Sequence, residues 1–335
     1  MKIVRPSRAF TLLELLVAIS ITLLLAGIML SVTTETLNLW RRTQGNFTAS
    51  AQAKLALDMI ERDLLAVTSR KTGTGSIWLA VDVINNPATL VNHGWQTGTL
   101  MKPAGAESIV VVPTTANPVI AEARFGLSGA WLRFISATAE STTELAVPRA
   151  ISYQIARRPL TGTNMTATNP AEVRYSFFRA AVSNANSFTA GNNVTAAAYD
   201  SNSQTPASTR NATTVTNPNS SDVLATNVVD FGVWLYARNP DGSLRRIFPS
   251  SNADFTHTAT DAVAPGDATM IPAVADVMIR ILTEEGARQI DVLERNNGSI
   301  IRPATFASDA LWWWAVVEAN SKVYTRRIEV MGVAL

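Results

Sequence analysis

The sequence predicts an α+β protein in which one long N-terminal helix packs on antiparallel β-sheet. Two observations support this fold class. Residues 15–32 form an apolar run without a charged side chain, and apolar residues continue at helical spacing as far as residue 71. From residue 76 the pattern changes to short runs of β-forming residues, separated by Gly, Pro, Asn and Asp. A helix followed by many strands is typical of α+β domains.

The first half of the predicted helix, residues 10–32, is long enough to cross a membrane. A bilayer core about 30 Å thick requires roughly 20 apolar residues in a helix. Lys2, Arg5 and Arg8 precede this segment, and cations that flank a span stay on the cytoplasmic side. We therefore expect a single-pass membrane protein with a cytoplasmic N-terminus. Glu14 is the one ionisable residue of the segment, and a carboxylate there costs at least about 2.5 kcal/mol, which calls for a functional reason.

The second half of the predicted helix, residues 33–71, is amphipathic. One helical face carries apolar residues with small residues in the gap, namely Leu37, Trp40, Phe47, Ser50, Ala53, Leu57, Ile60, Leu64 and Val67. Lys54, Asp58 and Arg62 lie four residues apart on another face, where they can pair. Glu61 and Asp63 are expected to face water. The threonines and glycines of residues 72–75 end the helix.

Residues 76–335 are predicted to form a β-rich globular domain. The expected strands cover residues 77–83, 108–112, 131–136, 151–157, 173–178, 228–237, 244–248, 277–283, 289–293, 311–317 and 324–330. Residues 239–242, Asn-Pro-Asp-Gly, predict a tight turn between two of these strands. Residues 189–221 are rich in Asn and Thr, which is typical of an insertion or a mobile loop.

Composition and charge exclude several classes of function. The chain has no cysteine, so disulfides, thiolate metal sites and cysteine nucleophiles are excluded. The formal net charge is +2, and residues 1–9 carry three cations and no acid, so their removal leaves −1. A nearly neutral protein argues against a nucleic acid as its partner.

The sequence contains no recognisable catalytic or metal-binding constellation. His93 and His257 each lie in a turn-like polar setting, which is typical of surface histidines. Residues 71–76 contain two glycines but lack the order of a phosphate-binding loop and follow a helix. The acids lack calcium-loop spacing, and the nearest candidates are Asp254, Asp261 and Asp267. We therefore expect a protein that is not an enzyme, with no cofactor and no metal.

Residues 8–15, Arg-Ala-Phe-Thr-Leu-Leu-Glu-Leu, resemble the class III signal of type IV pilins and type II secretion pseudopilins. That signal has a basic leader, a small residue, then Phe-Thr-Leu-[Leu/Ile]-Glu and a long apolar helix. The resemblance implies that residues 1–9 are a leader. A prepilin peptidase would cut between Ala9 and Phe10 on the cytoplasmic side and methylate the new amine of Phe10. The chain departs from the family at Ala9, where the usual residue is Gly.

Two other kinds of N-terminal segment also contain an apolar run. An ordinary secretory signal has its apolar region before the cut, whereas here the cations and the small residue precede the apolar run. A plain signal-anchor helix explains the apolar run but not Phe-Thr-Leu-Leu-Glu at its start. The alternative function, a membrane-anchored extracytoplasmic binding module that does not polymerise, therefore stays open.

Later segments resemble a narrower group. Residues 51–64 are similar to the end of the spine helix of minor pseudopilin J of type II secretion systems. Residues 228–233, 241–242 and 271–279 loosely resemble its C-terminal half. PilW-type minor pilins share much of this pattern, as do verrucomicrobial prepilin-like cassette proteins. The long Asn/Thr-rich segment departs from the compact pseudopilin, so the subtype stays open.

These resemblances imply a pilin-like fold and a role as a minor pseudopilin or minor pilin. Such a subunit is held in the inner membrane with its globular domain in the periplasm, and it primes or caps a type II secretion pseudopilus or a type IV pilus-like fibre. Its partners would be prepilin peptidase, other pilin-like subunits, and membrane lipid before assembly.

Glu14 is the residue expected to direct assembly. After processing, the methylated amine of Phe10 is a cation, and a neighbour's Glu14 can pair with it at the edge of the apolar bundle. The alternative is that Glu14 merely reaches the lipid headgroups.

The run Trp312-Trp313-Trp314 is expected to alternate across a strand. One side would then face the core and the other a partner, or both would be core.

Overall fold

The computed structural model describes residues 11–69, 75–85, 102, 119–139, 146–159, 173–199, 215, 218, 220–251, 253–261, 266–295, 300–330 and 333–334. It confirms an α+β fold in which one long helix is followed by antiparallel sheets. The chain divides into two compact units, residues 1–48 and 49–335. The described part of the first unit is helical, and the described strands belong to the second. The expected strand at 108–112 and His93 lie outside the described residues.

Helix α1 (Leu12–Leu65) is one uninterrupted helix of 54 residues. Its N-terminal part is long and apolar enough to cross a membrane. The helix ends at Leu65, before the glycines expected to stop it, because the chain turns there to meet the sheet. The amide of Val67 donates to the carbonyl of Leu64 at 3.2 Å, and Val67 forms a β-bridge with Ser136. Strand β1 (Thr68–Ser69) follows directly.

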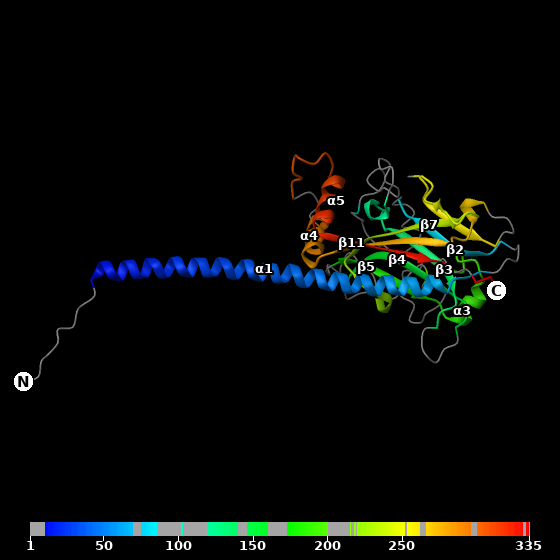
Figure 1. Cartoon of the computed structure of the whole chain (residues 1–335), viewed down its shortest axis with the longest axis horizontal. Coiled ribbons are helices and arrows are strands. Elements are labelled where there is room, and N and C mark those ends of the chain that lie inside the picture. The colour runs from blue at the N-terminus through cyan, green and yellow to red at the C-terminus, as the bar shows by residue number, and fades with distance from the viewer. Residues whose placement is uncertain are drawn as a thin grey trace, which may run out of the picture. The chain divides into compact units, whose positions relative to one another are not determined.

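The larger sheet has six antiparallel strands in the order β6-β5-β4-β3-β2-β9. Strands β2 to β5 are labelled in Figure 1. These strands are β2 (Ile77–Val83), β3 (Ala130–Ser136), β4 (Arg149–Pro159), β5 (Val173–Ala181), β6 (Val223–Thr226) and β9 (Thr256–Thr260). The four strands expected within β2 to β5 are confirmed. β6 and β9 were not predicted, because both are short and β9 is largely threonine.

The smaller sheet has four antiparallel strands in the order β11-β10-β7-β8. They are β7 (Val228–Arg238), β8 (Leu244–Phe248), β10 (Val274–Leu282) and β11 (Ser321–Glu329). The predicted turn between β7 and β8 is confirmed: the amide of Asn239 donates to the carbonyl of Ser243 at 2.9 Å, and Gly242 has φ +85°. A positive φ favours glycine, which has no Cβ.

The remaining described elements are short. Strand β12 (Val333–Ala334) pairs in parallel with β1. The short helices that connect described strands include α3 (Asn184–Ala190) and the 3-10 helices η2 (Ile120–Glu122), η4 (Ser220–Asp222) and η5 (Asp267–Thr269).

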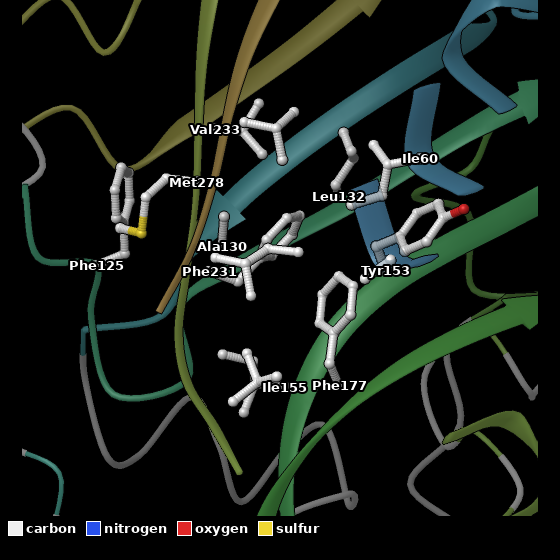
Figure 2. Close-up of a cluster of buried hydrophobic side chains, with 14 of the residues drawn as sticks. Ile60, Phe125, Ala130, Leu132, Tyr153, Ile155, Phe177, Phe231, Val233 and Met278 are labelled. Carbon is white, nitrogen blue, oxygen red and sulfur yellow. The ribbon is translucent and has the colours of Figure 1, made fainter. Parts of the chain in front are cut away.

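The main core lies where the second half of α1 meets both sheets. Figure 2 shows Ile60 of α1 near Tyr153 and Phe177 of the six-stranded sheet, with Phe231 of the other sheet close by. The ring centroids of Phe177 and Phe231 are 4.8 Å apart. Each large apolar side chain buried in this way contributes about 1.5–3 kcal/mol.

The predicted apolar face of the helix is buried between Ala53 and Val67. Leu37, Trp40 and Phe47, which were expected to continue that face, are instead exposed by 48%, 62% and 72%.

The opposite face of the six-stranded sheet carries a second, smaller core. Trp78, Trp131 and Phe178 form it with Val194, Tyr199 and Val215, which come from the Asn/Thr-rich part of the chain. The hydroxyl of Tyr199 donates to the carbonyl of Gly191 at 2.9 Å, and the side-chain amide of Gln154 donates to the carbonyl of Val215 at 3.1 Å. The described residues of that segment therefore help to cover one face of the sheet.

Two predicted strands, at 289–293 and 311–317, are wrong. The structure has helices there, α4 (Glu284–Arg295) and α5 (Asp309–Ala319), which lie side by side (Figure 1).

The three tryptophans were expected to alternate across a strand. They lie in helix α5 instead, so this alternation does not occur. The side chain of Ser308 accepts from the amide of Leu311 and caps α5, and Trp313, Trp314 and Val317 are buried on one helical face. Tertiary burial overrides the strand preference of Trp and Val.

Candidate functional site

Helix α1 begins in a capping box made by Thr11 and Glu14. The amide and the hydroxyl of Thr11 each donate to Oε2 of Glu14 at 3.0 Å, and the amide of Glu14 donates to the Thr11 hydroxyl at 3.2 Å. Thr11 and Glu14 thereby satisfy two of the backbone donors that a helix N-terminus leaves without an intrahelical partner. The negative charge also lies where the helix dipole favours it.

The capping box holds a carboxylate at the very start of an exposed apolar helix. Leu12, Leu13, Leu15 and Leu16 surround it, and all four are exposed. The carboxylate is therefore oriented and accessible, and it can accept from a cation that approaches the helix end. Ala9 and Phe10, the predicted processing residues, lie outside the described residues.

A second charged site, which we call the Asp63 clamp, fixes the other end of α1 to the sheet. Asp63 is fully buried. Its Oδ2 accepts from Nε of Arg179 on β5 and from the hydroxyl of Tyr153 on β4, both at 2.6 Å. Its backbone carbonyl accepts from the Ser136 hydroxyl on β3 at 2.8 Å. Burial, together with the adjacent Asp63 charge, raises the pKa of Tyr153 well above its ordinary value, so this hydroxyl remains a donor.

The expectation that Asp63 faces water is wrong, and its spacing from apolar residues in the sequence already indicated a buried position. Asp63 follows Ala56 by seven residues and Ile60 by three, and precedes Val67 by four. Those spacings place it on the buried face. Asp58 and Glu61 do lie at the surface, where Arg326 of β11 bridges them with Nη1–oxygen distances of 2.5 and 2.6 Å.

A third charged cluster joins α4 and α5 to the six-stranded sheet. The buried carboxylate of Glu294 accepts from Nε of Arg157 at 2.8 Å, from the Tyr175 hydroxyl at 2.6 Å and from Nε1 of Trp313 at 3.1 Å. Burial raises the pKa of Glu294. These contacts satisfy both carboxylate oxygens, so Glu294 has a structural role.

His257 is not the turn residue that was expected. It lies in β9, it is buried, and its Nε2 is 3.0 Å from the carbonyl oxygen of Met270. Burial lowers the pKa of His257, so it is neutral in the folded protein at neutral pH.

The three acids considered for calcium are engaged separately. Asp254 accepts from the amide of Ser250 at 2.7 Å, Asp261 accepts from the amide of Gly75 at 3.1 Å, and Asp267 pairs with Arg245. Within the part of the chain that the structure describes, no group of three His, Cys, Asp or Glu side chains could hold a metal ion.

Comparison with known proteins bears on the capping-box end of α1. Residues 4–30 match the family model for the prokaryotic N-terminal methylation motif. This is a prepilin-type N-terminus. No curated protein and no solved structure matches the chain. The match includes the predicted processing residues and Glu14, and it continues into the apolar half of α1. Proteins with this prepilin-type motif are structural subunits. The apolar first half of α1 in this chain fits an inner-membrane anchor.

Proposed function

We propose that this prepilin-type chain is a structural subunit, a minor pseudopilin or minor pilin, of a type II secretion pseudopilus or a type IV pilus-like fibre. The observation that carries the proposal is a methylation motif that leads directly into a helix whose first half is apolar and exposed. Such a helix must be shielded from water by lipid or by protein, because a contiguous apolar surface of this length is not stable in water. Lipid covers it before assembly, and other pilin-like subunits cover it in the fibre.

Each segment has its own role in such a subunit. Residues 1–9 are a leader that prepilin peptidase removes between Ala9 and Phe10, and residues 10–32 are the membrane-spanning half of the spine. Residues 33–71 connect this span to a periplasmic domain at 76–335. The subunit is not an enzyme, and it primes or caps assembly in the inner membrane.

Glu14 acts as the docking residue. In the free subunit its carboxylate accepts from the amide of Thr11, one residue beyond the future N-terminus. In the fibre it pairs with the N-methylammonium of Phe10 on a neighbouring subunit. Losing one partner of a buried ion pair costs about 3–5 kcal/mol, so an unpaired subunit is rejected from the bundle.

The mature N-terminus tests the proposal directly. Protein extracted from membranes is digested, and its N-terminal peptide is identified by mass spectrometry. N-methyl-Phe10 is the expected result. An intact Met1 would contradict the proposal and favour a membrane-anchored binding module.

The docking role is tested with Glu14→Gln. The amide oxygen of the new side chain can still accept from Thr11, so the cap is kept and the charge is lost. We expect normal membrane insertion and at least a tenfold drop in recovery in sheared fibres, since each 1.4 kcal/mol is about tenfold. Glu35→Gln on the same helix is the matched control and should assemble normally. If the two variants assemble equally well, Glu14 is not the docking residue.

A further inference from the structure

Lys102 and Asp230 bring a primary amine and a carboxyl group together inside the domain. Neither side chain is exposed to solvent, and Nζ of Lys102 lies 2.9 Å from Oδ1 of Asp230. Among the buried side chains that the structure describes, Lys102 is the one primary amine. The buried carboxylates of Asp63 and Glu294 instead face arginines, and a guanidinium stays charged in proteins. The Lys102 amine, in contrast, can lose its proton and become a nucleophile.

Burial opposes the charge on both members of this pair. Desolvation lowers the pKa of Lys102, although the neighbouring Asp230 carboxylate works against this shift. Desolvation also raises the pKa of Asp230, against the opposing effect of Lys102 and Arg280. Transfer of one proton from Nζ to Oδ1 leaves a neutral amine beside a neutral carboxylic acid. These two groups are the reactants of an amide bond.

The backbone around the pair holds both groups in place. Nζ of Lys102 also donates to the carbonyl of Phe125 at 2.9 Å. Oδ2 of Asp230 accepts from the amide of Phe125, and Oδ1 accepts from the amide of Phe231, both at 3.1 Å. The amide at Oδ2 lies where negative charge develops when an amine attacks the carboxyl carbon, as in an oxyanion hole. Two reactants fixed in this way can have an effective concentration of about 10⁵–10⁸ M.

We propose that Lys102 and Asp230 condense to form an intramolecular isopeptide bond. The electron pair of the neutral Nζ forms a bond to Cγ of the protonated carboxyl, and the electrons of the C=O bond move to Oδ2. A proton then passes from Nζ to the Oδ1 hydroxyl. The Cγ–Oδ1 bond breaks, the carbonyl forms again at Oδ2, and one water leaves. The product is a secondary amide, and the reaction consumes no other reactant.

An isopeptide bond gives a chain without cysteine a covalent tie. It joins residues that are 128 positions apart in the sequence and restricts the unfolded chain as a disulfide does. The amide is not broken by thiols, and it removes two buried charges whose desolvation is unfavourable. This inference does not depend on the proposed function as a fibre subunit.

Peptide mass spectrometry of the full-length protein tests the bond. The protein is purified from membranes, denatured and digested with trypsin, which does not cut between Lys102 and Pro103. We expect one branched peptide made of residues 72–124 and 211–238, lighter than the sum of the two by one water. Fragmentation should place the link between Lys102 and Asp230. Recovery of the two peptides only as separate species would overturn the inference and leave the pair as an ion pair.

Lys102→Arg is the test variant, and Lys54→Arg is its matched control. Lys102→Arg keeps a cation opposite Asp230, but a guanidinium does not form the amide, so the branched peptide should be lost. Lys54 is exposed on α1, so Lys54→Arg should retain the branched peptide. A branched peptide that persists in Lys102→Arg would overturn the assignment of the bond to this amine. If Lys102→Arg does not fold, the digest of the unsubstituted chain still decides whether the bond exists.

Discussion

Replacing Asp63 by alanine tests how the globular domain holds its spine helix. The substitution removes a fully buried carboxylate that accepts from Arg179 and Tyr153 at 2.6 Å. The guanidinium of Arg179 would keep its buried position and lose this charge partner. Breaking a buried ion pair from one side costs about 3–5 kcal/mol. We therefore expect Asp63→Ala to lower the free energy of unfolding by about that amount.

Companion variants divide this cost among its contacts. Tyr153→Phe removes one hydrogen bond to a charged group and should cost about 1.5–3 kcal/mol. Asp63→Leu combined with Arg179→Met removes both charges of this pair. The double variant should be less destabilised than Asp63→Leu alone, because the pair is removed from both sides rather than from one.

The measurement is urea unfolding of the full-length chain in detergent, followed by tryptophan fluorescence. Asp58→Ala is the matched control. It lies on the same helix and pairs with Arg326 at the surface, and a surface ion pair contributes about 0–1 kcal/mol. If Asp63→Ala unfolds within 1 kcal/mol of this control, the assignment of the Asp63 clamp as the main charged anchor is wrong.

Three further outcomes follow from the structure. Because burial lowers the pKa of His257, the folded state binds its proton less readily than the unfolded state. Stability should therefore fall as pH drops below about 6.5, by up to about 1.4 kcal/mol per pH unit, and His257→Gln should make the urea midpoint depend less on pH. A Cβ at Gly232 would overlap the buried ring of Phe125, so Gly232→Ala should cost about 1–3 kcal/mol, measurable by the same unfolding. Glu294→Leu should destabilise by about 3–5 kcal/mol, seen as a lower melting temperature, because Arg157 would lose its buried partner.

The hydrophobic pattern of the sequence predicted the secondary structure correctly where one element keeps a single periodicity over a long stretch. Helix α1 and strands such as β2 and β7 follow from their own residues, and so does the turn at Gly242, because hydrophobic spacing and turn chemistry are read within a few residues. The capping box is equally local, since Thr11 and Glu14 are three residues apart.

The hydrophobic pattern predicted the wrong secondary structure where a short segment fits both a strand and a helix periodicity. Residues 289–293 alternate in polarity, yet Ala287 and Ile290 are buried at helical spacing. Three tryptophans followed by Ala-Val-Val have strand propensity, and a helix forms because Ser308 caps it and Trp313, Trp314 and Val317 bury one face.

The sequence by itself determined a lipid-compatible helix, its processing motif and the β-rich character of the rest, because these depend on composition and on neighbours close along the chain. Tertiary structure alone decided that Asp63 is an anchor, that His257 is buried and that residues 284–295 and 309–319 are helices. Each of these depends on partners far away in the sequence: Asp63 and Arg179 are 116 residues apart, and a buried charge is stable only where such a partner meets it.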